Sequence, residues 1–195
     1  MKIKKSLLLL TVLLLVPFFS YGQIKIQPSK SLTLTGSSFL QFQSYKRTDG
    51  YDISITYWEQ YQFLTIDYSP SQVESFKYSL IEIRKKFNEW AAIARQNNVQ
   101  EVEKPIPVNI PNVNLAHGYN LSNTRDVSIK PIFKVYKSYP MCLIRIDARS
   151  PGFYRNCEWI LNDSTILGII RLIDEISDEQ KNRDYNQKRT EDLFQ

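Results

Sequence analysis

Residues 61–98 read YQFLTIDYSPSQVESFKYSLIEIRKKFNEWAAIARQNN. The first part, 61–68, alternates between apolar and polar residues, which is the pattern of a half-buried strand. Ser69, Pro70 and Gln72 follow it. A serine N-cap, a proline at the first helical position and a glutamine three residues after the serine form a capping box. This stretch therefore predicts a strand that leads directly into a helix.

The predicted helix has one apolar face. Its large apolar residues recur at spacings of three and four, and charged residues occupy the opposite face. Asn97 and Asn98 offer a stop signal. Such a stripe can form a coiled-coil seam, but residues of this size more often cover a sheet. The apolar residues are Val73, Phe76, Leu80, Ile83, Phe87, Trp90 and Ala94.

The same alternation predicts further strands on both sides of this helix. They are expected at about 31–36, 38–46, 52–58, 127–137, 140–147 and 156–161, and a second helix is expected at about 163–178. The sequence therefore predicts an α+β fold in which two helices cover antiparallel sheet. Its parts are a half at 23–98, a Pro/Asn-rich connector at 99–126, a half at 127–178 and a charged tail at 179–195.

The two strand-to-helix junctions agree in register. Counting from Ser69, apolar residues fall at +4, +7, +11 and +14, and counting from Asn162 they fall at the same offsets. This agreement suggests two (β3-4)α repeats, although an amphipathic helix after an alternating strand often produces it by chance. The element order loosely resembles PC4/PUR/Whirly folds. That resemblance implies a module that binds single-stranded nucleic acid through curved sheets carrying basic and aromatic groups.

The first 22 residues resemble a secretory signal peptide. Three lysines among the first five residues precede an apolar run over 7–19, and the small residues Ser20 and Gly22 suit a cleavage site before Gln23. The run is shorter than the roughly 20 apolar residues that a membrane span needs. We therefore expect a bacterial periplasmic or secreted protein, with no transmembrane span after cleavage.

Removing the signal peptide changes the charge of the protein. The full chain of 195 residues has a net charge of +5, and loss of the three lysines lowers it to +2. So small a charge is unlike that of a nucleic-acid-binding protein. Export and low charge together argue against the nucleic-acid role that the resemblance implies.

Two cysteines, Cys142 and Cys157, raise the question of a disulfide. If the last two strands pair with their apolar faces matched, the cysteines lie four residues apart, roughly 13 Å at about 3.3 Å per residue. A disulfide needs Cα atoms within about 7 Å, whereas an oxidising compartment favours one. Both states therefore stay open. This pairing also places Arg145 opposite Glu158 as an outward ion pair.

Catalytic motifs are scarce in this sequence. It has one histidine, His117, which is too few for common zinc sites, and it has no nucleophile elbow, metalloprotease motif or glycine-rich phosphate loop. We expect no metal, no cofactor and no enzyme. A carboxylate-dependent hydrolase is an alternative, since two acids on neighbouring strands can converge. The acids on or beside strands are Asp52, Glu59, Asp67, Asp147 and Glu158.

Aromatic and basic residues gather on the polar faces of the predicted strands, together with Lys130. Rings beside polar groups suit protein or glycan recognition, although these residues could instead pack beneath the connector or the other half. We expect a non-catalytic binding protein that uses such a face or the connector. A PUR-like single-strand nucleic-acid binder is a further alternative. The candidate binding residues are Tyr45, Lys46, Arg47, Trp58, Tyr61, Lys134 and Tyr136.

Overall fold

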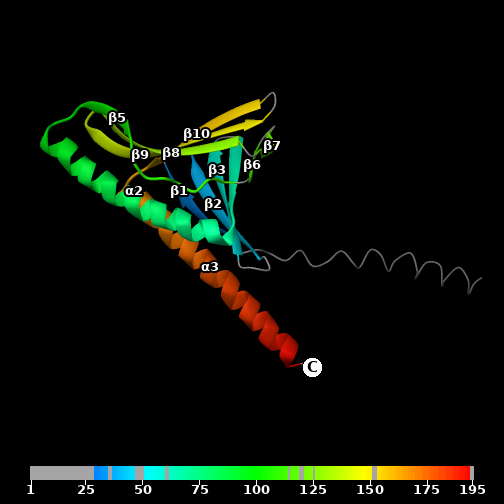
Figure 1. Ribbon diagram of the computed structural model, residues 1–195. Helices are drawn as coiled ribbons and strands as arrows, with labels where there is room; N and C mark the ends of the chain where they lie inside the picture. Colours follow the sequence, from blue (N-terminus) through cyan, green and yellow to red (C-terminus); the bar gives the residue numbers. More distant parts are fainter. Residues whose placement is uncertain are drawn as a thin grey trace, which may run out of the picture.

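The computed structural model describes most of the chain after residue 28 (Figure 1). The described residues are 29–34, 37–46, 51–59, 62–113, 115–118, 121–124, 126–150 and 153–193, and within them the side chains of 46, 62, 115–118, 121–124, 126, 148–150 and 153–156 are left out. The predicted signal peptide, Arg47 and Tyr61 lie outside the described residues.

The first sheet has six antiparallel strands in the order β1-β2-β3-β4-β6-β7. One face buries alternate residues such as Leu40, Phe42, Ile55 and Ile66, as the period of two requires. The strands are β1 (Ser29–Thr33), β2 (Phe39–Lys46), β3 (Tyr51–Glu59), β4 (Gln62–Tyr68), β6 (Leu115–Gly118) and β7 (Leu121–Thr124).

The second sheet has four antiparallel strands in the order β10-β9-β8-β5. Its inner face buries Phe133, Ile144 and Trp159. The strands are β5 (Glu101–Pro105), β8 (Asp126–Tyr136), β9 (Tyr139–Ser150) and β10 (Phe153–Leu161).

The same order of elements occurs twice in the described chain. Strands β1 to β4 form a meander that leads into helix α2 (Pro70–Gln96), and β5, β8, β9 and β10 form a meander that leads into helix α3 (Asp163–Asp192). The hairpin β6–β7 is inserted into the second meander and pairs with β4 of the first sheet. The predicted α+β class, with antiparallel sheets and two helices, is confirmed.

Both helices begin with the caps that local sequence requires. The backbone N–H of Ser69 donates to Oε1 of Gln72 at 2.9 Å, which completes the predicted capping box. At α3, the backbone N–H of Thr165 donates to Oδ1 of Asn162 at 3.0 Å, and Oγ1 of Thr165 accepts from the N–H of Asn162 at 2.7 Å. Each meander therefore ends in a capped helix start.

The two helices run antiparallel and lie against each other (Figure 1). Ion pairs join them, at 2.9 Å between Lys77 Nζ and Asp174 Oδ1 and at 2.7 Å between Arg84 Nε and Asp163 Oδ1. Each helix also contacts strands of both sheets: α2 contacts β3, β4, β8 and β9, and α3 contacts β1, β2 and β10. The two halves therefore share one hydrophobic core.

The segment predicted as a connector, 99–126, contributes to both sheets in the structure. It contains β5, β6 and β7, and between β5 and β6 residues 106–113 form an ordered stretch that we call the strap. The strap runs alongside α2 without forming a strand or helix, because its prolines remove backbone donors. It is nevertheless anchored, since Ile106, Ile110 and Val113 are buried.

Helix α3 continues well past the predicted end at residue 178. Its buried face is extended by Gln180, which is 4 % exposed, and Glu179 forms an ion pair with Lys30. The hydroxyl of Tyr51 also donates to Asp184 at 3.2 Å. The last turns, 185–192, are exposed and project beyond the sheets (Figure 1). From the sequence alone this stretch was either a fraying helical extension or a solvated tail, because the contacts that hold it are polar.

The two cysteines are buried thiols, and no disulfide joins them. The ladder pairs Cys157 with Ile146, Trp159 with Ile144 and Leu161 with Cys142, which is the register predicted from the sequence. Burial raises the pKa of the Cys142 thiol to about 12. The disulfide alternative therefore does not hold, because the register separates the two side chains along the hairpin.

In the described part of the chain, neither helix combines the length and the apolar character that crossing a membrane would need.

Gly168 of α3 lies against β1. A Cβ added there would lie 3.2 Å from Cδ1 of Leu32, the end of a flexible side chain in an edge strand. We expect Gly168→Ala to raise the free energy of unfolding by about 0.5 kcal/mol. Alanine has a helix propensity about 1 kcal/mol more favourable than that of glycine, and the tight contact with Leu32 offsets part of this gain. Urea denaturation measures this. Gly168→Leu is the control: its side chain is too large for this contact, so it should destabilise the protein. A decrease of more than about 1 kcal/mol in the free energy of unfolding of Gly168→Ala would contradict the expectation.

Candidate binding groove

A groove lies between the strap and the outer side of β8. Its volume is about 690 Å³, within the range of about 300–1,000 Å³ that is usual for ligand sites. Its wall combines aliphatic side chains and prolines with charged and amide side chains. The lining residues are Glu103, Lys104, Pro105, Ile106, Val108, Asn109, Ile110, Asn112, Ile129, Lys130, Pro131, Ile132 and Arg145.

Helix α2 holds one wall of the groove in place. The hydroxyl of Ser79 donates to the carbonyl of Asn109 at 2.7 Å, and Nε2 of Gln72 donates to the carbonyl of Asn112 at 2.6 Å. At the start of the strap, the backbone N–H of Ile106 donates to the carbonyl of Pro131 at 2.9 Å. The strap is therefore tied to both α2 and β8 by hydrogen bonds within the chain.

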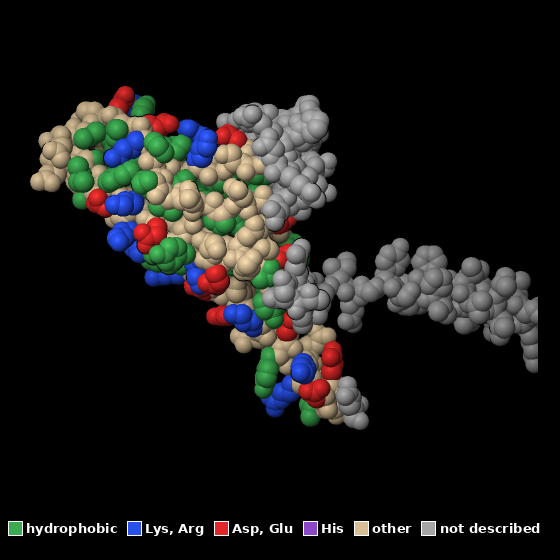
Figure 2. Space-filling model, viewed as in Figure 1, with side chains coloured by type: hydrophobic (Ala, Val, Ile, Leu, Met, Phe, Trp, Pro, Cys, Tyr) green, Lys and Arg blue, Asp and Glu red, His purple; other side chains and the backbone are tan. Residues whose placement is uncertain are grey.

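Charged side chains line one side of the groove. Glu103 lies between Lys134 and Arg145, with N–O distances of 3.1 and 3.2 Å, and Nε of Arg145 donates to Glu158 at 2.6 Å. The Lys134 and Arg145 side chains hold the pKa of Glu103 below its usual value. Figure 2 shows basic and acidic side chains side by side over this edge of the molecule. The predicted Arg145–Glu158 pair is thus confirmed as part of a larger network.

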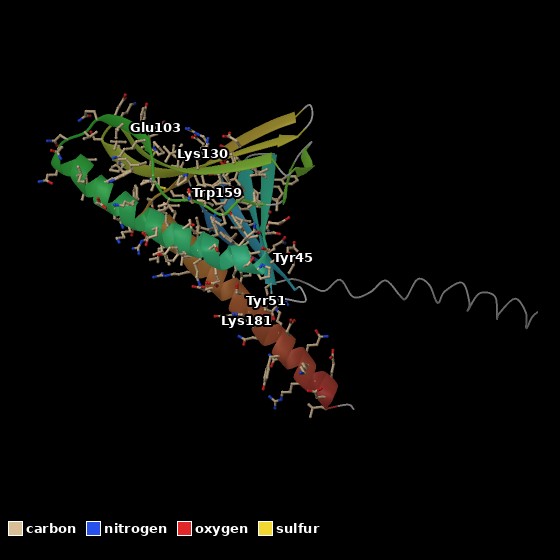
Figure 3. All side chains as sticks on the ribbon, viewed as in Figure 1. Tyr45, Tyr51, Glu103, Lys130, Trp159 and Lys181 are labelled. Carbon is tan, nitrogen blue, oxygen red and sulfur yellow. The ribbon has the colours of Figure 1, made fainter. Side chains whose placement is uncertain are left out.

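Lys104 and Lys130 both line the groove, and neither has a carboxylate partner among the described residues, but the two lie on opposite faces of the second sheet. Lys104 Nζ lies 3.5 Å above the ring of Trp90, a cation–π contact. Lys130 is exposed on the outer face of β8. Figure 3 shows Glu103 and Lys130 near each other at this side of the molecule, and Tyr45 far from both.

Tyr45 and Trp58, predicted as binding residues, lie at opposite ends of one sheet face. Tyr45 is opposite Asp52, whereas Trp58 is opposite Phe39, six residues along β2 and roughly 20 Å away at about 3.3 Å per residue. The Tyr45 hydroxyl donates to Gln43 at 2.7 Å. Burial, and then the charge of Asp67, raises its pKa.

The Trp58 ring is not an open platform. It is half-buried between Phe39, with ring centroids 6.0 Å apart and nearly parallel, and Phe63, with centroids 5.1 Å apart. Neighbouring rings thus cover both sides of the indole. This row of three aromatic residues, at matching positions of β2, β3 and β4, accounts for Trp58 by packing.

The other predicted binding residues are divided between the sheets. Lys134 and Tyr136 lie on the outer face of β8, where Lys134 is paired with Glu103 and Tyr136 is 47 % exposed. Lys46 ends β2 in the first sheet, and its side chain is outside the described part. Within the described residues, the structure therefore does not gather Lys46 with Lys130 and Lys134, as a nucleic-acid-binding face would require.

The acids considered for catalysis are also distributed over two sheets. On the first sheet, Asp67 accepts a hydrogen bond from Ser54, directly opposite it, while Glu59 ends β3. On the second sheet, Glu158 is held by Arg145. Among the described residues, no three His, Cys, Asp or Glu side chains lie close enough to hold a metal ion. His117 is opposite Thr65 in β6, and its side chain is outside the described part.

The sequence prediction missed most residues of the groove. Of the candidate binding residues, none lines it, whereas Lys130, noted beside them, and Pro105 and Pro111 of the connector lie in or beside it. One signal was present in the sequence: aliphatic residues alternate with prolines over 105–111. Such a segment lacks some of the backbone N–H groups that pairing in a sheet requires, but its aliphatic side chains can still be buried. It can therefore form the wall of a groove.

No known protein family, no curated protein and no solved structure matches this chain.

Proposed function

We propose that the chain is an exported, non-catalytic recognition protein that binds a segment of another polypeptide in the groove between the strap and β8. The groove itself carries this proposal, because hydrogen bonds within the chain hold its walls and it combines aliphatic side chains with charged and amide groups. Segments from two parts of the chain meet there: the end of β5 and the strap, and the outer side of β8 and β9.

The signal sequence supports a location in the periplasm or outside the cell. Its three lysines, its apolar run and the small residues Ser20 and Gly22 are those of a secreted precursor. The partner would then be a protein of the cell envelope or the surroundings.

A polypeptide suits the groove better than a glycan does. None of the described residues that line it is aromatic, so this part of the chain offers no ring on which a sugar could stack. Aliphatic side chains of a peptide can instead bury their surface against Pro105 and Val108, which keep exposed surface at the groove, each contributing up to about 1.5–3 kcal/mol if it becomes fully buried. The aromatic row at Phe39, Trp58 and Phe63 supports a glycan site less well, since its rings pack on one another.

A displayed library of random linear peptides tests the proposal. The mature protein is panned beside two variants that obstruct the groove, Val108→Arg and Asn109→Trp, and a control, Ile93→Arg, at an exposed position of α2 outside the groove lining. We expect peptides enriched by the wild type and by Ile93→Arg to bind at least about tenfold more weakly to both groove variants. Circular dichroism melts establish that all four proteins are folded.

Equal capture of the enriched peptides by all four proteins would place binding elsewhere and overturn the groove assignment. Failure to enrich any peptide, combined with binding on a glycan array, would replace the polypeptide with a sugar ligand.

A further inference from the structure

The groove lining carries an excess of positive charge. It includes Lys104, Lys130 and Arg145 but a single carboxylate, Glu103. Low-dielectric aliphatic walls beside these charges strengthen their field inside a cleft relative to an open surface. An anionic group on a ligand would therefore be attracted to this rim.

The three cations differ in how far their charge is already satisfied. Arg145 contacts two carboxylates, Glu158 at 2.6 Å and Glu103 at 3.2 Å. Lys104 lies over the Trp90 ring. Lys130 makes no ion pair with any described residue, and it is exposed at the groove between Ile129 and Pro131. Binding of an anion by Lys130 would thus break no existing pair.

Lys130 also stands next to the apolar part of the groove. Ile132, which follows it on the same outer face of β8, is buried, whereas Pro105, opposite Ile132 on β5, is exposed. A ligand that reaches Lys130 with a carboxylate would place its neighbouring side chain over Pro105 and the adjoining strap.

We propose that the polypeptide segment bound in the groove carries a carboxylate that Lys130 binds, next to aliphatic side chains that contact Pro105 and Val108 on the strap side of the groove. This inference rests on the proposed function and specifies the partner: an acidic, aliphatic segment rather than a basic or aromatic one. Lys130 is then the residue that determines the charge specificity of the groove.

Two fluorescein-labelled peptides that differ only in charge test the inference. One has the sequence Gly-Val-Asp-Ile-Asp-Val-Gly, and the other has asparagine in place of both aspartates. Fluorescence anisotropy measures their affinity for the mature wild-type protein, for Lys130→Gln and Lys130→Glu, and for the matched control Lys134→Gln. Lys134 is on the same strand and face, but Glu103 already pairs with it.

We expect the wild type to bind the acidic peptide about five- to tenfold more tightly than its amide counterpart, as one charge-assisted contact allows. The ratio should fall to about one in Lys130→Gln and invert in Lys130→Glu, while Lys134→Gln retains it. The wild-type ratio should also decrease as salt rises from 50 to 500 mM, roughly the range over which screening becomes strong.

The other outcomes separate the two proposals. If the wild type binds both peptides equally, and Val108→Arg loses both, the groove binds polypeptides but the acidic preference is wrong. If Lys130→Gln keeps the full ratio, Lys130 is not the specificity residue. If neither peptide binds, the acidic aliphatic class is overturned, and the library experiment decides about the groove. Displacement of the acidic peptide by an oligogalacturonate, but not by excess unlabelled peptide, would assign the charge preference to acidic glycans.

Discussion

Residues 23–98 and 99–195 are each expected to be unfolded when they are produced as separate polypeptides. Helix α3 buries Ile166, Ile169, Ile173 and Ile176, all at most 1 % exposed, and it packs on β1 and β2 of the other half. Four buried isoleucines contribute about 1.5–3 kcal/mol each, which together approaches the 5–15 kcal/mol that is typical of a whole domain. Helix α2, which belongs to 23–98, contacts β8 and β9 in the same way. The separate polypeptide 99–195 therefore lacks the helix that covers these strands.

Urea titrations followed by far-UV circular dichroism measure this prediction. Neither half should show a cooperative transition alone, and an equimolar mixture should recover one. A chain that ends at residue 185 is the control, because the described residues after it are exposed. Its free energy of unfolding should change by no more than about 0.5 kcal/mol. A cooperative transition in either isolated half would show that the helices do not bind the two sheets together.

Trp159→Ala is expected to cost about 3–5 kcal/mol of stability, the range for truncating a large aromatic residue in a core. Trp159 is fully buried, at 0 % exposed, opposite Ile144 in the second sheet. Figure 3 shows it in the interior of the molecule. Its removal leaves a cavity that neighbouring helices and strands cannot close without losing their own contacts. Guanidinium denaturation gives the change in the free energy of unfolding.

Trp159→Phe is the matched control. The indole Nε1 of Trp159 is buried and has no hydrogen-bond partner among the described residues, so its removal leaves none of their donors or acceptors newly unsatisfied. Phenylalanine keeps much of the buried ring, and we expect a loss of roughly 1–2 kcal/mol or less. A loss in Trp159→Phe equal to that in Trp159→Ala would mean that the indole nitrogen, rather than the buried volume, accounts for the effect.

Local periodicity predicted several features of this protein correctly. The alternation of Cys142, Ile144 and Ile146 against Cys157, Trp159 and Leu161 was sufficient to predict the β9–β10 register. A shift of one residue would have turned this apolar set to the solvent, so the register had one acceptable value. The capping box at Ser69 could also be predicted from the sequence, because it depends only on residues within one helical turn.

The candidate site was predicted less well. Aromatic residues on a polar strand face look like binding residues in the sequence, but Trp58 packs between Phe39 and Phe63 from two other strands. Conversely, Val108 and Ile110 lie in a proline-rich stretch and become groove walls only because α2 and β8 hold that stretch in place. Such contacts join residues far apart in the chain, and no local pattern encodes them.

The sequence by itself determined most of the elements: the strands β1 to β4 and β8 to β10, the beginning of each helix, the apolar face of each of these elements and the pairing of β9 with β10, but not β5, β6 and β7. The tertiary structure alone decided what each apolar face covers. Helices α2 and α3 each contact both sheets, and the strap encloses a groove beside Lys130. The physical reason is that the hydrophobic effect is non-directional. An apolar stripe must be buried, but its sequence does not specify which surface covers it. That surface is decided by how all the elements pack together.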